Sequence, residues 1–109
     1  MRDLKWSPSE KIVARRAFDQ ALTAELQDAV RRAKQIAAAV KQPSELWELE
    51  TWLTQRRLEI DRKYDYRYSV LPMVFATLIK QGRISEKDLH GLHGEKIDLI
   101  IGLASRLRT

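Results

Sequence analysis

Residues 22–40 read LTAELQDAVRRAKQIAAAV, and apolar side chains recur in this stretch at alternating steps of four and three residues. The recurring positions are Leu22, Leu26, Ala29, Ala33, Ile36 and Val40. This heptad spacing is typical of a helix that packs lengthwise along another helix. Small alanines in the stripe allow the neighbouring helix to approach closely. The pattern therefore predicts a long helix with a long helical neighbour.

The expected start of this first helix lies at Ser7. Its hydroxyl can cap the helix, Pro8 suits the first helical position, and Glu10 stands where it completes a capping box. No glycine or proline follows until after Lys41. We therefore predict one uninterrupted helix that ends near Lys41.

A second helix is expected to begin at Pro43 and Ser44, which end the first. Its residues at steps of three and four form a matching seam, namely Leu46, Leu49, Leu53, Arg56 and Ile60. Because the connection is short, the two helices should be antiparallel neighbours. Residues 1–65 thus read as a long antiparallel helical hairpin.

One hairpin cannot cover all of its own apolar surface. Trp47 and Trp52 cannot both lie on the second helix's seam, and much of the apolar content is alanine, which buries little area. Small chains with thin cores often complete themselves by oligomerising. We therefore predict a homodimer formed through the hairpins, with contacts from Leu46, Leu49, Trp52 and Leu53.

Residues 66–109 are predicted to form a small helical head. A helix from Val70 to about Lys80 is apolar on several sides, which indicates burial, and Gly82 ends it. Ser85 and Asp88 resemble a weak capping box for a short helix, and a last helix is expected after Gly94. The predicted fold class is all-α.

Charge and composition argue against several functions. The net charge is +5, but residues 1–43, 44–70 and 71–109 carry +4, −1 and +2, so no segment has a strongly single-signed stripe of the kind that nucleic-acid binders use. There is no cysteine for a disulfide or a thiolate metal site. The longest apolar run, residues 70–76, is too short to cross a membrane. We expect a cytoplasmic protein without a nucleic-acid partner or membrane insertion.

Catalytic chemistry has little support. His90 and His93 lie three residues apart without a firm third ligand, so we predict no metal site. No phosphate-binding glycine loop and no nucleophile in a suitable context occurs. The fairest enzymatic alternative is a helical enzyme that binds small dianions, as chorismate mutases do, with a pocket lined by Arg56, Arg57, Glu59 and Lys63. We predict a protein that is not an enzyme and needs no cofactor.

Trp47 and Arg57 are the strongest candidates for a binding site. Trp and Arg are among the residues that dominate binding hot spots. They are ten positions apart on one helix, nearly three turns, so we expect them on about the same face at roughly 15 Å. That separation suits an extended protein–protein contact and is too long for one catalytic centre.

Residues 47–70 read WELETWLTQRRLEIDRKYDYRYSV, and this stretch resembles the fluorescence recovery protein family of cyanobacteria. The family pattern runs Trp-x-Leu-His-Asp-Phe-Leu, then Lys-Arg-x-Glu-Ile-Asp-x-Lys-Tyr-Asp-x-Arg-x-Ser-Val. The chain matches it at Trp47, Leu49, Leu53, Arg57, Glu59, Ile60, Asp61, Lys63, Tyr64, Asp65, Arg67, Ser69 and Val70. Weaker matches extend the resemblance over nearly the whole chain.

The resemblance implies an all-helical dimer that binds the light-activated orange carotenoid protein. Members of the family detach that protein from the phycobilisome and speed its return to the resting form, which ends fluorescence quenching. It also implies a cytoplasmic location, with a peripheral position at the cytoplasmic face of thylakoids as a further expectation. No bond is made or broken in this activity.

The resemblance has a gap at the family's functional patch. Trp47 and Arg57 match the patch, but Glu50 stands where the family has His and Thr51 where it has Asp, while Trp52 replaces a Phe. Charge changes of this kind can cost several kcal/mol of partner discrimination. Two hypotheses remain open. Either the chain serves a carotenoid protein with a compensating surface, or it keeps the dimeric scaffold and binds another protein.

Overall fold

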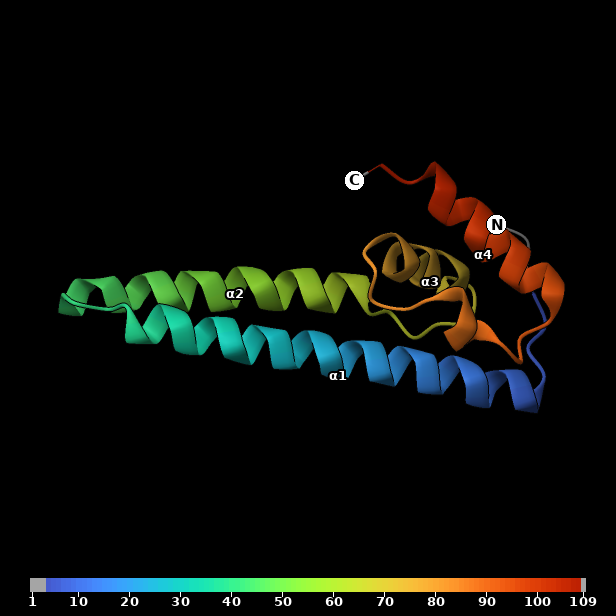
Figure 1. The fold of residues 1–109 in the computed structure, drawn as a ribbon, viewed down its shortest axis with the longest axis horizontal. Helices are drawn as coiled ribbons and strands as arrows, with labels where there is room; N and C mark the ends of the chain where they lie inside the picture. The colour runs from blue at the N-terminus through green and yellow to red at the C-terminus, as the bar shows by residue number, and fades with distance from the viewer. Residues whose placement is uncertain (1–3, 109) are drawn as a thin grey trace.

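The computed structural model describes residues 4–108, and within that range the chain is helical, with one isolated bridge between His90 and Leu92 and no strand. Helices α1 (Pro8–Ala38) and α2 (Leu46–Lys63) form a long antiparallel hairpin, joined through the short 3₁₀ helix η1 (Pro43–Glu45) (Figure 1). Helices α3 (Leu71–Lys80) and α4 (Gly94–Arg106), with the 3₁₀ helix η2 (Glu86–Leu89) between them, form a head at one end. The predicted all-α hairpin and head are confirmed.

The start of α1 follows the predicted capping box. The Glu10 amide donates to Ser7 Oγ at 3.2 Å, and the Ser7 amide donates to Glu10 Oε1 at 3.0 Å. The helix ends at Ala38, three residues before the expected position. Gln42 precedes Pro43 and has an extended backbone, as residues before proline prefer, so the helix cannot continue through Gln42. The short helix expected near Ser85 is only a 3₁₀ turn.

The hydrophobic core lies where the head meets the first half of α1. Small side chains of α1 let the head approach it closely, and Phe18 packs edge-on against the rings of Tyr64 and Tyr66, with centroids 5.4 and 4.9 Å away. The core combines Ala14, Ala17, Phe18 and Ala21 with Leu71, Val74, Phe75, Leu78, Leu89 and Ile100. The division of the chain into residues 1–65 and 66–109 stays a prediction, and the two parts share one core.

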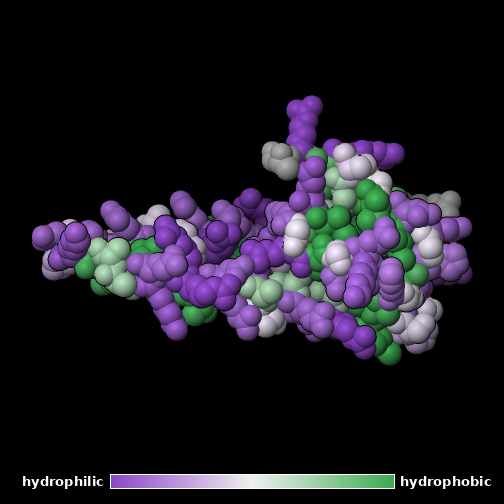
Figure 2. All heavy atoms as spheres, in the orientation of Figure 1, coloured by the Kyte–Doolittle hydropathy of each residue, from purple (hydrophilic) through white to green (hydrophobic). Residues whose placement is uncertain are grey.

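The far half of the hairpin has no comparable core. Every side chain from residue 26 to residue 59 is at least partly exposed, and Ile60 is the first buried residue of α2. Figure 2 shows hydrophobic residues at the surface of this end, among hydrophilic ones. The hairpin therefore projects from the head, in a molecule that measures 54 × 25 × 20 Å, with apolar side chains in solvent.

The loop between η2 and α4 runs unusually close to α1. Gly91 has a φ of 109°, and a Cβ atom there would lie 2.7 Å from Val13 Cγ2. Both the backbone conformation and the lack of space require glycine. This close approach brings the start of α4 against the beginning of α1.

An ion pair fastens α4 to the start of α1. Lys96 Nζ donates to both carboxylate oxygens of Glu10, at 3.0 and 3.1 Å, and the His93 amide donates to Glu10 Oε2 at 2.8 Å. Lys96 also lies 5.1 Å from the centre of the Trp6 ring. Glu10 and Lys96 are both buried, so each satisfies the other's charge.

Glu10 should make the stability of the protein sensitive to acid. Burial alone would raise the pKa of Glu10, but the hydrogen bonds from Ser7, His93 and Lys96 outweigh it and lower the pKa to about 2. A carboxyl whose folded-state pKa is depressed stabilises the fold above its unfolded pKa and loses that contribution as pH falls towards the folded value. The difference in Tm between the unmodified chain and Glu10→Gln should therefore be constant above about pH 5 and shrink towards pH 2. Thermal unfolding followed by circular dichroism tests this; a gap independent of pH would contradict it.

Candidate functional site

Six large apolar side chains stand exposed on the far half of the hairpin. They lie on both helices and form what we term the distal apolar surface: Leu26 and Val30 on α1, with Leu46, Trp47, Leu53 and Leu58 on α2. Single exposed apolar residues are ordinary, but six large ones on one small projection favour a role in protein interaction. Helix periodicity identified Leu26, Leu46 and Leu53 as candidates, and residue type identified Trp47. It missed Val30 and Leu58, which lie off the two heptad seams.

The predicted partner-binding residues are all exposed. Trp47 is 64% exposed, and the Arg57 side chain is 83% exposed, with a loose ion pair of 3.8 Å to Asp61. Glu50 and Thr51 are exposed between them. At about 100° per residue, ten residues leave Trp47 and Arg57 about 80° apart around the helix axis. The two therefore occupy adjoining sides of α2 rather than a single face, and their role in binding stays a prediction.

The four predicted dimer residues divide into two pairs. Leu46 and Leu53 are exposed, whereas Leu49 and Trp52 are half-buried. Leu49, Trp52 and the buried Ile60 recur at steps of three to eight on one side of α2, the side that packs within the molecule. Leu46 and Leu53 are consequently the better candidates for contact with a second copy.

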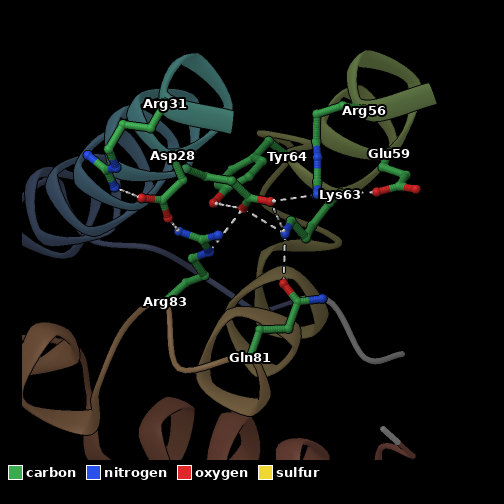
Figure 3. Close-up of polar contacts among 9 residues, drawn as sticks. Asp28, Arg31, Arg56, Glu59, Lys63, Tyr64, Gln81 and Arg83 are labelled. Atoms are coloured by element: carbon green, nitrogen blue, oxygen red, sulfur yellow. Dashed lines mark hydrogen bonds and ion pairs between the residues drawn. The ribbon is translucent and has the colours of Figure 1, made fainter. Parts of the chain in front are cut away.

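A cluster of charged side chains joins the hairpin to the head (Figure 3). At its centre Glu25, whose side chain is only 4% exposed, accepts hydrogen bonds from Lys63 Nζ at 2.7 Å and from the Tyr64 hydroxyl at 2.8 Å. Arg83 of the head lies 3.5 Å from Glu25 and donates to Asp28 at 2.6 Å. Contacts among α1, the end of α2 and the head thus converge on one carboxylate, which we call the Glu25 cluster.

The Glu25 cluster holds its central carboxylate in the charged form. Burial would raise the pKa of Glu25, but the hydrogen bonds from Lys63 and Tyr64 and the charges of Lys63 and Arg83 lower it below the usual value. Burial and the bond to Glu25 raise the pKa of Tyr64, so its hydroxyl stays a donor. The sequence offered no local sign of this cluster, because Lys63 and Tyr64 are 38 and 39 residues away from Glu25 along the chain.

A groove of about 730 Å³ opens beside the Glu25 cluster, between the end of α2 and α3. Its residues, which define the junction groove, are Glu25, Arg56, Glu59, Arg62, Lys63, Asp65, Val70, Met73, Val74, Thr77, Gln81 and Arg83. The enzymatic alternative placed Arg56, Arg57, Glu59 and Lys63 in one pocket. Three of these line the junction groove, but Arg57 does not, and Glu59 reaches solvent with 64% of its side chain exposed.

The described part of the chain contains neither a group of side chains that could bind a metal ion nor a helix that could span a membrane. Within residues 4–108, no three His, Cys, Asp or Glu side chains gather closely enough to hold a metal ion. His90 and His93 are both exposed, and His93 Nδ1 accepts a long hydrogen bond of 3.5 Å from the Glu95 amide at the start of α4. No helix in this range is long and apolar enough to cross a membrane.

The sequence and its fold of a long hairpin with a head match a known family. A family model described as the photoprotection regulator fluorescence recovery protein matches residues 6–104. This chain belongs to the fluorescence recovery protein family. The Fluorescence recovery protein of Synechocystis sp. PCC 6803 is 36% identical over 99 residues, which cover 91% of each chain.

Solved structures of the fluorescence recovery protein family share the fold. The structure from Fremyella diplosiphon matches with a TM-score of 0.87 and 41% identity, over 94% of this chain and 100% of that one. The structure from Synechocystis sp. PCC 6803 also gives a TM-score of 0.87, with 36% identity over 93% and 99% of the two chains. The predicted resemblance, fold class and regulatory role in photoprotection are therefore confirmed.

Proposed function

We propose that this chain binds the photoactivated orange carotenoid protein and accelerates its return to the resting form, which ends the quenching of phycobilisome fluorescence. The observation that carries the proposal is the family match over residues 6–104, which includes the exposed Trp47. The protein acts in the cytoplasm as a regulator and not as an enzyme. Each tenfold acceleration requires preferential binding to the closing conformation by about 1.4 kcal/mol.

Timing the colour recovery of a photoactivated orange carotenoid protein in darkness, with and without this chain, tests the proposed function. We expect recovery to be at least tenfold faster with the chain present, because a few exposed aromatic and cationic side chains can supply the required binding free energy. Recovery that stays unchanged with several carotenoid proteins would eliminate the proposal.

A second candidate is a family scaffold that binds another protein. It is favoured by Glu50 and Thr51, which are both exposed on α2 and replace the family's His and Asp. The double variant Glu50→His, Thr51→Asp separates the candidates. Recovery activity in the double variant but not in the unmodified chain would favour the second candidate, whereas activity in both favours the first.

We further propose that two copies pair through their hairpins. The far half of the hairpin buries no side chain of its own, and Leu46 and Leu53 stand exposed on one stripe of α2. Glu45 directly precedes α2, the first half of α2 carries Glu48 and Glu50, and Arg56 and Arg57 follow in its second half. Antiparallel contact between two α2 helices would bring these opposite charges together, as a two-fold interface allows.

Leu53→Glu is expected to convert the dimer to a monomer. Two carboxylates would then be introduced into one apolar contact, where neither can be paired. Light scattering after size exclusion should show the mass fall to that of one 12.7 kDa chain. Leu58→Glu is the matched control, since Leu58 is also exposed but lies about 140° around α2 from Leu53, and its mass should not change. A dimer that survives Leu53→Glu would refute this interface.

A further inference from the structure

The junction groove has two unlike walls. Cationic side chains from the last turns of α2 form one wall, and Val70, Met73 and Val74 form the other. Met73 is 37% exposed, so part of its side chain is open to a ligand in the groove. The Thr77 hydroxyl donates to the Met73 carbonyl at 3.0 Å, so the polar end of Thr77 is occupied and its methyl group is left for the apolar wall.

The acidic side chains of the groove all have partners within the part of the chain that the structure describes, whereas one of its cationic side chains does not. Four cationic and three acidic side chains line it. Each acid already has a cation from the same chain: Glu25 has Lys63 and Arg83, Glu59 has Arg56 at 3.4 Å, and Asp65 has Arg67 at 2.6 Å. Arg62 forms no ion pair or hydrogen bond with any residue of the range 4–108. The groove is therefore left with an excess of positive charge at Arg62.

The floor of the groove is held in place before any ligand arrives. The Glu25 side chain is 4% exposed and the Lys63 side chain 14%, and Lys63 donates a second hydrogen bond of 2.6 Å to Gln81 (Figure 3). A ligand would not need to order these groups, and such preorganisation raises affinity. The volume of about 730 Å³ also lies within the range of roughly 300–1,000 Å³ that is usual for binding clefts.

We propose that the junction groove is a second docking site for the protein partner, and that it takes a segment in which a carboxylate lies next to a bulky apolar side chain. The carboxylate pairs with Arg62, and the apolar side chain packs on Met73 and Val70. The groove is open to solvent along its cationic wall, where Arg62 and Glu59 are exposed, so it suits a side chain carried on another protein's surface. The net charge of +5 also favours an acidic partner.

This inference rests on the proposed function, since it assigns the segment to the orange carotenoid protein. A second copy of this chain is the rival occupant, because its own α2 begins with glutamates beside Leu46 and Trp47. Docking of a second copy would make Arg62 necessary for the dimer, whereas docking of the carotenoid protein would not. The mass of the protein therefore distinguishes the two occupants.

Met73 provides a direct reporter for the experiment. The chain has only two methionines, Met1 and Met73, so labelling with ¹³C-methyl methionine gives one signal in the groove and one reference signal. Adding photoactivated orange carotenoid protein should shift or broaden the Met73 signal. Arg62→Glu should weaken the binding at least tenfold with an unchanged mass by light scattering. Arg16→Glu, an equal charge change at an exposed position of α1, should leave binding within twofold.

Three results would overturn the proposal: an unmoved Met73 signal in a bound complex, unchanged affinity of Arg62→Glu, or loss of the dimer in Arg62→Glu.

If the unmodified chain does not bind the carotenoid protein at all, the proposed function fails, and binding of a short peptide then tests the junction groove by itself. The probe is acetyl-Glu-Leu-Glu-Leu-amide, with acetyl-Gln-Leu-Gln-Leu-amide as its neutral counterpart. A Met73 shift that needs both the glutamates and Arg62 supports the groove as a site for acidic, apolar segments. No shift at millimolar peptide refutes it.

Discussion

Trp47→Ala is expected to weaken binding to the photoactivated orange carotenoid protein by about thirtyfold or more. Truncating a hot-spot tryptophan commonly removes about 2 kcal/mol or more of binding free energy. Trp47 is the largest exposed side chain of the distal apolar surface, and 64% of it is free to contact a partner. Titrating this chain against a fixed amount of carotenoid protein, and following the recovery rate, gives the affinity of each variant.

The same titration needs a control for the loss of exposed apolar area. Ile12→Ala serves, because Ile12 is 61% exposed but lies on the first half of α1, beside the head. Its affinity should stay within twofold of the unmodified chain. Since Trp47 makes little contact within the molecule, Trp47→Ala should change the free energy of unfolding by no more than about 0.5 kcal/mol. Equal binding by Trp47→Ala and Ile12→Ala would remove Trp47 from the partner site.

Glu25→Gln is expected to lower the free energy of unfolding by about 3 kcal/mol. The change keeps the size of the side chain but removes the buried negative charge that pairs with Lys63, and it leaves Arg83 with Asp28 as its acidic partner. This value lies at the lower end of the range that is usual for breaking a buried ion pair, because 26% of the Arg83 side chain remains in contact with water. Urea unfolding followed by circular dichroism measures the difference.

The matched control for Glu25→Gln is Asp19→Asn. Asp19 lies on the same helix and also pairs with an arginine, Arg15, at 3.2 Å, but both of these side chains are more than half exposed. Exposed pairs contribute about 0–1 kcal/mol, so Asp19→Asn should have little effect. Because the pKa of Glu25 is lowered in the folded state, the effect of Glu25→Gln should also diminish as pH falls below the unfolded value. Equal effects of the two substitutions at neutral pH would show that the Glu25 cluster does not hold the head.

The features that the sequence predicted well are local ones. The capping box of Ser7 and Glu10, the turn at Pro43 and the heptad seams each depend on residues a few positions apart, and these produced the hairpin. The end of α1 lies three residues before the predicted position, because Pro43 restricts only Gln42 and leaves the exact last residue of the helix open.

The features that the sequence did not reveal depend on long-range contacts. Nothing around Glu25 distinguishes it from an ordinary surface glutamate of a helix, since Lys63, Tyr64 and Arg83 approach it only after the chain has folded. Periodicity also placed Leu49 and Leu53 on one seam, without separating the side that faces α1 from the side that faces solvent. The junction groove requires both the end of α2 and α3, so no single segment indicates it.

The absence of buried side chains from residue 26 to residue 59 has a consequence for how this family can evolve. Substitutions in a core are limited by packing, whereas substitutions at exposed positions usually change folding stability little. The exposed positions of α2 can therefore accumulate changes such as Glu50 and Thr51 without endangering the folded head. Selection for a new or altered partner can act on one end of the molecule while the other end conserves the fold.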